Sequence, residues 1–236
     1  LVNLVVRKVK KLVPPFNLPG AVRFNDAIAQ GERGSLRQPE IKPDDVAVLQ
    51  YTGGTTGVSK GAVLLHRNVI ANLLQSEAWN QPAMAKVPAG EQPTAVCALP
   101  LYHIFALTVN ALMGMQQGAQ NILIPNPRDI PGFVKELGKY PAHIFPGLNT
   151  LFNALANEPG FSRLDFSELV ISNGGGMAVQ GAVADKWLKQ MGCPICEGYG
   201  LSETSPSASC NPVTNTSFTG TIGVPLSSTW MKIIDD

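Results

Sequence analysis

The feature that most constrains the fold is a regular alternation between Thr94 and Tyr199. Short apolar runs rich in β-branched residues alternate there with segments whose apolar residues recur at helical spacing. The predicted strands cover residues 94–99, 121–125, 143–147, 168–174 and 194–199, and the predicted helices cover 103–117, 130–140, 149–157 and 179–191. Such an alternation with short connections predicts an α/β fold with a mainly parallel sheet and helices on both faces.

In a sheet of this kind a ligand lies beyond the carboxyl ends of the strands, where the loops converge. The segments that follow four of the predicted strands are "PLYH" (100–103), "PGLN" (146–149), "NGGGM" (173–177) and "GYGLSET" (198–204). Residues with a purely structural role would be scattered over both ends of the strands. Their concentration at one end favours a binding crevice.

A glycine loop, "YTGGTTGVSKG" (51–61), lies upstream between predicted strands at 45–52 and 61–66, before a predicted helix at 67–80 and a loop at 81–93. It is not a Walker loop, because Lys60 precedes Gly61 and a strand follows. Glycine amides, hydroxyl groups and one ammonium nevertheless suit an anion. The residue types alone favour a plain hairpin turn equally.

The segment "GYGLSET" supplies groups that the glycine loop lacks. Tyr199 offers a flat ring on which a base can stack. Ser202 and Thr204 are hydroxyl donors, and Glu203 is a carboxylate suited to Mg²⁺, which accompanies nucleotide phosphates. Together the two loops predict a magnesium–nucleotide site.

Five motifs occur in an order and spacing that resemble the adenylate-forming superfamily, and within it the bacterial long-chain fatty acyl-CoA synthetases. They are "YTGGTTGVSKGAVLLHRNV", "LPLYHIFAL", "SNGGGM", "EGYGLSETSP" and "GTIGVPL". The resemblance covers essentially the whole chain. It implies an AMP-forming ligase that uses ATP and Mg²⁺ to convert a fatty acid to an acyl-adenylate, releasing pyrophosphate. Coenzyme A then displaces AMP to give the acyl-CoA.

The resemblance also implies roles for individual residues. The loop over the β- and γ-phosphates would comprise Thr52, Gly53, Gly54, Thr55, Thr56, Gly57 and Lys60. Three glycines, Gly174, Gly175 and Gly176, would line the adenine and acyl pocket, where only bare backbone leaves room. Ser59 stands where the family commonly has proline, and both residues are small.

In the second nucleotide loop, the resemblance implies that Tyr199 stacks on adenine beside Gly200 and Thr204, that Ser202 contacts the α-phosphate and that Glu203 holds Mg²⁺. Ser202 replaces the usual threonine of the family but keeps its hydroxyl group. His103 would lie near the reacting carboxylate. The alternative for His103 is a histidine whose hydrogen bonds are satisfied at the start of a helix.

The absence of acidic residues near His103 is one indication of which acid is the substrate. Amino-acid-activating relatives place an aspartate near the position of His103, whereas residues 95–120 contain no Asp or Glu. A substrate ammonium would be left unpaired there, which favours an uncharged acyl tail. A long tail is implied by the resemblance alone, and a medium-chain or aryl acid–CoA ligase is the alternative.

Composition excludes some classes of protein. The net charge is +1 and charged residues make up 15%, so no basic excess indicates nucleic-acid binding. A single CxxC, Cys193–Cys196, has no second metal-binding pair and is interpreted as structural, in a reducing, cytoplasmic setting. The apolar stretch 95–115 is interrupted by Pro100, His103 and Asn110, which favours a buried strand, a turn and a helix over a membrane span.

The first 45 residues are predicted to be an amphipathic segment and a connector, and residues 46–236 a nucleotide- and acyl-binding subdomain. Arg7, Lys8, Lys10 and Lys11 alternate with apolar residues. This segment either contacts an anionic surface on the inner face of the membrane or packs as an amphipathic helix on another part of the protein.

We also expect the chain to be part of a large domain that lacks its mobile C-terminal partner and has little activity alone. A non-catalytic nucleotide- or acyl-binding module is the alternative from another class. The oligomeric state stays open.

Overall fold

The structure is a computed structural model that describes residues 2–52 and 59–235. The chain divides into two units, Leu1–Ile41 and Lys42–Asp236. The first unit contains α1 (Val2–Leu4), the π-helical turn η1 (Val5–Val9) and α2 (Phe24–Gly31). The segment predicted to be a connector therefore contains one short helix, and the basic N-terminal segment forms only short helical turns.

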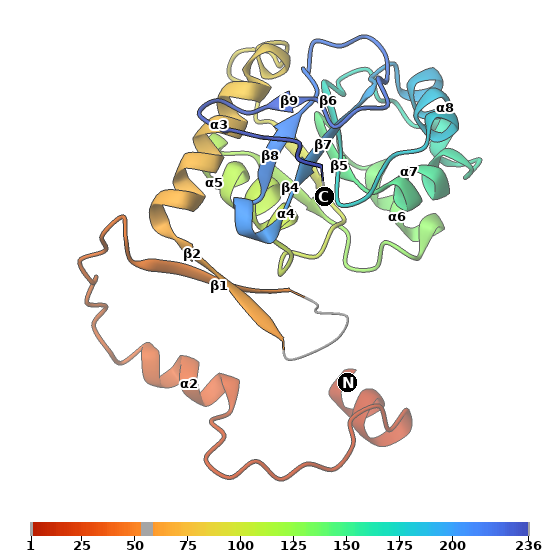
Figure 1. The fold of residues 1–236 in the computed structure, drawn as a ribbon. Coiled ribbons are helices and arrows are strands. Elements are labelled where there is room, and N and C mark those ends of the chain that lie inside the picture. The colour runs from red at the N-terminus through yellow and green to blue at the C-terminus, as the bar shows by residue number, and fades with distance from the viewer. Residues whose placement is uncertain (1, 53–58, 236) are drawn as a thin grey trace. The chain divides into compact units, whose positions relative to one another are not determined.

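The second unit is built on a seven-stranded sheet with the order β4-β3-β5-β6-β7-β8-β9 (Figure 1). Its strands are β3 (Thr94–Cys97), β4 (Gln120–Leu123), β5 (Ile144–Gly147), β6 (Ile171–Gly174), β7 (Ile195–Gly200), β8 (Ser207–Cys210) and β9 (Val224–Pro225). The pairs from β4 to β7 are parallel, and β7–β8 and β8–β9 are antiparallel. The predicted mainly parallel sheet is confirmed, although several strands are shorter than predicted.

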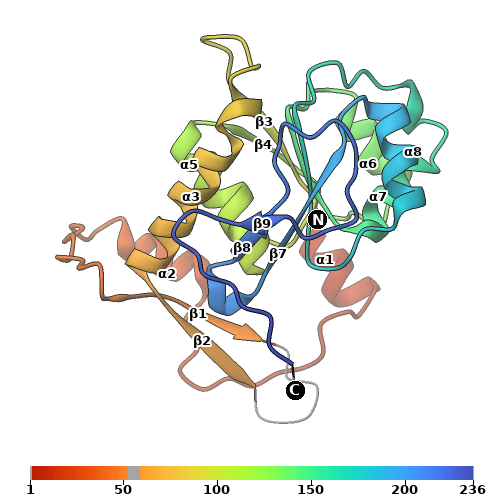
Figure 2. The same ribbon diagram turned by 45° about the horizontal axis from the view of Figure 1, so that its top comes forward.

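Helices cover both faces of this sheet (Figure 2). One face carries α6 (Ile130–Leu137), α7 (Asn149–Ala156) and α8 (Gly181–Met191), and the other carries α3 (His66–Met84). Alternate residues of each strand point to opposite faces. In β5, for example, Phe145 joins the core under α6, α7 and α8, whereas Ile144 joins the smaller core under α3.

Two predicted boundaries were wrong or incomplete. Helix α3 continues to Met84 and includes Pro82, where a loop was predicted from residue 81. Ala83 is almost fully buried, so packing on the sheet outweighs the helix-breaking tendency of proline. The predicted helix at 103–117 is divided into α4 (Ile104–Ala106), a π-helical segment η2 (Leu107–Leu112) and α5 (Met113–Gln117).

The stretch 95–115 accordingly forms a strand, a turn and these helical segments. Among the helices in residues 2–52 and 59–235, none combines the length and the apolar character that crossing a bilayer requires.

The glycine loop connects two antiparallel strands, β1 (Val46–Thr52) and β2 (Lys60–Leu65), which pair with Thr52 opposite Lys60. Both strands were predicted. The hairpin packs on the start of α3 and on α4 through a small core that contains Leu64, Val69 and Ile104. Gly53, Gly54, Thr55, Thr56 and Gly57 lie outside the described residues.

Candidate functional site

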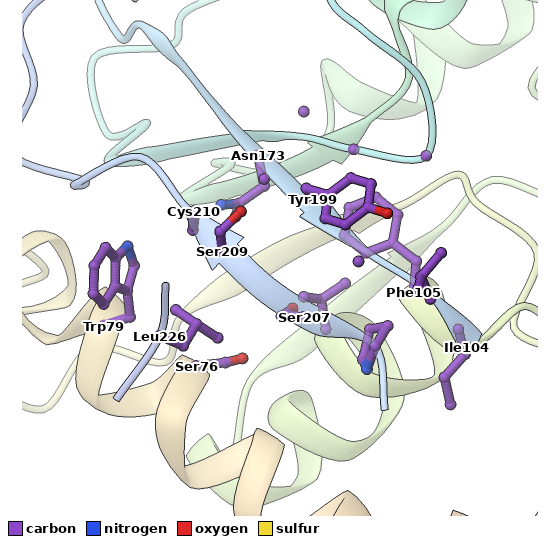
Figure 3. Close-up of a pocket in the computed structure, with 18 of the residues that line it drawn as sticks. Ser76, Trp79, Ile104, Phe105, Asn173, Tyr199, Ser207, Ser209, Cys210 and Leu226 are labelled. Carbon is purple, nitrogen blue, oxygen red and sulfur yellow. The ribbon is translucent and has the colours of Figure 1, made fainter. Parts of the chain in front are cut away.

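A cavity of about 200 Å³ lies at the carboxyl ends of β6 and β7, between these strands, α3, α4 and β8. It brings together several of the residues predicted from separate motifs: His103, Gly174, Gly175, Gly176, Tyr199, Gly200 and Ser202. Figure 3 shows Tyr199 beside Phe105 toward one end of the lining, and Trp79 with Leu226 and Ser76 toward the other. The sequence prediction that the loops converge on one crevice agrees with this geometry.

Two glycines in the lining are fixed by close contacts. A Cβ atom at Gly200 would lie 2.0 Å from the carbonyl oxygen of Pro206, so only glycine allows the backbones of β7 and β8 to approach there. A Cβ at Gly174 would lie 2.8 Å from both Ile195 and Val179. Bare backbone is thus required at Gly174 by the core beneath it, a reason that differs from the room for a ligand expected from the sequence.

The loop after β6 is tied to β7 by a residue that sequence reasoning did not single out. Glu197 is 6% exposed, and its Oε1 accepts a hydrogen bond of 3.1 Å from the amide of Val179. Burial raises the pKa of the Glu197 carboxyl group, and the amide donor opposes that rise. Glu197 therefore positions the loop that follows β6. The only indication of this role in the sequence was the occurrence of a polar residue within an otherwise apolar strand.

His103 is exposed and precedes α4, where its Nδ1 accepts a hydrogen bond of 3.2 Å from the amide of Phe105. Since Nδ1 is the acceptor, the proton of the neutral ring lies on Nε2. The helix-capping role named as an alternative is therefore real. It leaves Nε2–H as the atom that can donate to a ligand in the cavity that His103 lines.

Residues Ser202–Thr204 form a 3₁₀ turn, η4. The hydroxyl of Thr204 accepts from the amide of Leu201 at 2.9 Å and also bonds to the Leu201 and Pro206 carbonyls. Thr204 thus holds its own turn. Ser202 lines the cavity, while Glu203 and Thr204 line a neighbouring hollow between η4 and the hairpin.

Thr52 and Lys60 stand at the open ends of β1 and β2 and do not line the cavity. The Thr52 hydroxyl donates to the carbonyl oxygen of Lys60 at 3.3 Å, which closes the end of the hairpin. Lys60 is exposed. Strand β2 lies against η4, so the hairpin and the Ser202–Thr204 turn are neighbours as the two-loop prediction requires.

The wall opposite the glycines comes from residues that no motif indicated. Ser76, Trp79 and Asn80 of α3 line the cavity together with Ser209 and Cys210 of β8. The Trp79 Nε1 donates to the Asn211 carbonyl at 3.0 Å, across a sequence separation of 132 residues. Nothing local in the sequence signals that this face of α3 meets β8.

No Asp, Glu, Lys or Arg of the described part of the chain lines the cavity. Its walls are carbon, backbone and neutral polar groups, and its ionisable side chains are His103, Tyr199 and Cys210. A charged ligand group in its interior would have no opposite charge to pair with. The site favours an uncharged group inside and leaves charged groups at the rim, where Ser202 and η4 lie.

The rim residues fit a magnesium–phosphate group in donor chemistry. Glu203 is exposed and makes no ion pair within the described residues, so its carboxylate is free to act as a hard oxygen ligand. The ammonium of Lys60 belongs to the adjoining hairpin. Oxygen and ammonium groups of this kind suit a nucleotide phosphate and its cation.

A mainly parallel α/β sheet with a crevice at the carboxyl ends of its strands is the arrangement in which α/β proteins bind ligands. A family model described as "AMP-binding enzyme" matches residues 7–236. The chain belongs to the AMP-binding enzyme family.

Known relatives agree with this assignment. The chain is 53% identical over 236 residues to a long-chain-fatty-acid–CoA ligase of Escherichia coli O157:H7, covering 100% of this chain and 41% of that protein. It is 34% identical over 207 residues to the enzyme of the same name from Bacillus subtilis (strain 168), covering 87% of this chain and 36% of that protein.

Among solved structures, an anthranilate CoA ligase, AuaEII, in complex with anthranoyl-AMP superimposes with a TM-score of 0.73 at 21% identity. The match covers 86% of this chain and 38% of that one. This likeness shows the fold. The chain spans about two fifths of the length of the curated relatives that it matches.

Proposed function

We propose that the chain forms the nucleotide- and acyl-binding part of an ATP-dependent long-chain fatty acid–CoA ligase. The observation that carries the proposal is the 53% identity along all 236 residues to a protein named for that reaction. The uncharged cavity beside the rim residues supports it, because a fatty acid has one charged end and an apolar tail.

The proposed reaction has two steps. A carboxylate oxygen of the acid attacks the α-phosphorus of ATP, an oxygen–phosphorus bond forms, and pyrophosphate leaves. The sulfur of coenzyme A then attacks the acyl carbon and AMP leaves. The acid is already a nucleophile in the first step, so the main demand on the protein is to position it and to stabilise charge at phosphorus.

In this proposal Tyr199 stacks on adenine and Ser202 donates to the α-phosphate, with Thr204 holding their turn. Lys60 and Thr52 contact the β- and γ-phosphates with Gly53, Gly54, Thr55, Thr56 and Gly57. Gly174, Gly175, Gly176 and Gly200 present backbone to the nucleotide and the acyl group. His103 donates from Nε2 to the substrate carboxylate.

Glu203 would hold Mg²⁺, which when bound neutralises charge on the phosphates. The exposure of its carboxylate supports this assignment. Contact of the basic N-terminal segment with a membrane is left as a separate prediction of the sequence.

The first test is binding to the 236-residue chain. A non-hydrolysable acyl-adenylate analogue, hexadecanoyl-sulfamoyl-adenosine, is titrated by calorimetry, and we expect binding that Tyr199→Ala weakens at least about tenfold through lost stacking. The matched control is Tyr140→Ala, an exposed tyrosine outside the cavity. Failure of the analogue to bind would reject the proposal.

The second test is ATP–pyrophosphate exchange by the complete ligase that we propose, with acids from acetate to octadecanoate and with benzoate. Exchange with long fatty acids supports the proposal. Exchange confined to aryl or medium-chain acids would replace it with the corresponding ligase.

A further inference from the structure

Trp79 lies at the end of the cavity opposite Tyr199 (Figure 3). We propose that Trp79 closes this end and sets the greatest length of acyl tail that the cavity accepts. The inference rests on the proposed function and adds to it a residue that determines chain length.

The first argument for this role is the position of Trp79 in the cavity. Tyr199 and Phe105 lie toward one end of the lining, and Trp79 lies toward the other, beside Leu226 and Ser76 (Figure 3). A carboxylate held near His103 would place its tail away from the rim. The tail would then run toward the indole ring.

The indole is held in place from two sides. Its Nε1 donates to the Asn211 carbonyl at 3.0 Å, and its ring packs on the core formed by Ala83, Ala95 and neighbouring residues under α3. A ring fixed in this way is a wall and not a mobile gate, because moving it would break the hydrogen bond and expose apolar surface.

Two of the polar groups in the lining are engaged with the protein. The Ser209 hydroxyl donates to the Ile222 carbonyl at 2.8 Å, and the Asn80 amide nitrogen contacts Met113 Sδ at 3.6 Å. Leu226, which is 3% exposed, supplies apolar surface beside the indole. A ligand that reaches Trp79 therefore meets the carbon surface of the indole and of Leu226, with Ser76 beside them.

The test uses a series of acyl-sulfamoyl-adenosines from butanoyl to octadecanoyl, titrated into the full chain by calorimetry. In the wild-type chain we expect affinity to rise about threefold to fourfold per added methylene group until the tail meets Trp79, and then to stop rising. In Trp79→Ala the rise should continue for about three more carbons, because removal of the indole lengthens the apolar cavity.

Three further variants distinguish the effect of side-chain size at position 79 on the chain-length limit from other effects of the substitution. Trp79→Phe keeps a ring but loses the bond to Asn211, so its limit should stay within about one carbon of wild type. Trp79→Leu is used where Trp79→Ala does not fold, and it should give an intermediate limit. Leu74→Ala, on the exposed side of the same helix, should leave the limit unchanged.

The outcomes separate the two proposals. If no analogue binds, the proposed function fails. If analogues bind but Trp79→Ala and Trp79→Leu leave the limit where it is, the role of Trp79 is overturned while the proposed function stands. A Trp79→Phe limit equal to that of Trp79→Ala would also overturn the proposal, since loss of the hydrogen bond and not of bulk would then explain the shift.

Discussion

The two ends of the same sheet carry two hollows of opposite character. The cavity at the carboxyl ends is lined by glycines, aromatic rings and neutral polar groups. A second hollow, of about 480 Å³, lies at the amino ends of β5, β6 and β7 and is lined by Lys86, His143, Glu168, Cys193 and Cys196. By residue type alone, the second hollow has more of the side chains that perform catalysis.

The distances between these side chains argue against a catalytic role for the second hollow. His143 of the amino-end hollow lies between two carboxylates: its Nε2 is 3.3 Å from Glu91 Oε1 and 3.4 Å from Glu168 Oε2, without a hydrogen bond to either. His143 Nδ1 accepts from the Thr94 amide at 3.1 Å, so the ring carries its proton on Nε2, between the two carboxylates. A metal at Nε2 would need the opposite tautomer, with Nδ1 protonated. The three side chains bring together the segments that precede β3, β5 and β6.

The largest expected effect comes from comparing a glycine at the carboxyl ends of the strands with a glycine at the amino ends. Gly200→Ala should lower the free energy of unfolding by more than about 3 kcal/mol, because its Cβ would clash with the Pro206 carbonyl at 2.0 Å. Gly192→Ala, at the amino-end hollow, should cost only about 1 kcal/mol, because its φ is +68° but nothing lies within 4 Å of its Cβ. Urea unfolding followed by circular dichroism measures both. Equal losses would contradict the distinction.

The sheet was predictable because its signal is repeated: four short apolar runs between residues 94 and 174 are each followed by a segment with helical spacing. The convergence of His103, Gly174 and Tyr199 followed from topology alone. The end of α3 was not predictable, because Pro82 signals a break and only the burial of Ala83 outweighs it.

The contacts inside the site could not be predicted either, because they join segments that are far apart in the sequence. Trp79 of α3 binds Asn211, which follows β8, and the partners of His143 come from two other connections of the chain. Contacts between distant segments depend on which side of each helix and loop faces the sheet. No local sequence pattern predicts which side of a helix or loop faces the sheet.

The second prediction concerns the thiols of the amino-end hollow. Burial raises the pKa of Cys196 to about 12, and neighbouring Cys210 and Cys193 contribute. At pH 8 the thiolate fraction of Cys196 should therefore be about a thousandfold below that of an ordinary cysteine. Reaction with a thiol-specific chromogenic reagent should be correspondingly slow in the native chain and normal in urea. Rapid native reaction, or a Cys193–Cys196 disulfide under mild oxidation, would restore a redox role for the CxxC pair.

The third prediction returns to the carboxyl ends. In the complete ligase that we propose, Lys60→Ala should slow ATP–pyrophosphate exchange about a hundredfold, because an ammonium that stabilises developing phosphate charge is lost. The exposed Lys60 should contribute little to folding, so the midpoint of urea unfolding should not move. Lys135→Ala, an exposed lysine of α6, is the matched control. Parallel losses of stability and exchange in Lys60→Ala would reduce the glycine loop to a turn.

The smallest expected effect tests the interpretation of the His143 cluster. Glu168 is half exposed, so Glu168→Gln should lower the free energy of unfolding by less than about 1 kcal/mol at pH 7. Because the Thr94 amide keeps Nδ1 as an acceptor, added Zn²⁺ should leave the melting temperature of the wild-type chain unchanged. A zinc-dependent rise that Glu168→Gln abolishes would show that the ring can change tautomer and bind metal. The amino-end hollow would then be a second site, and the contrast between the two ends of the sheet would fail.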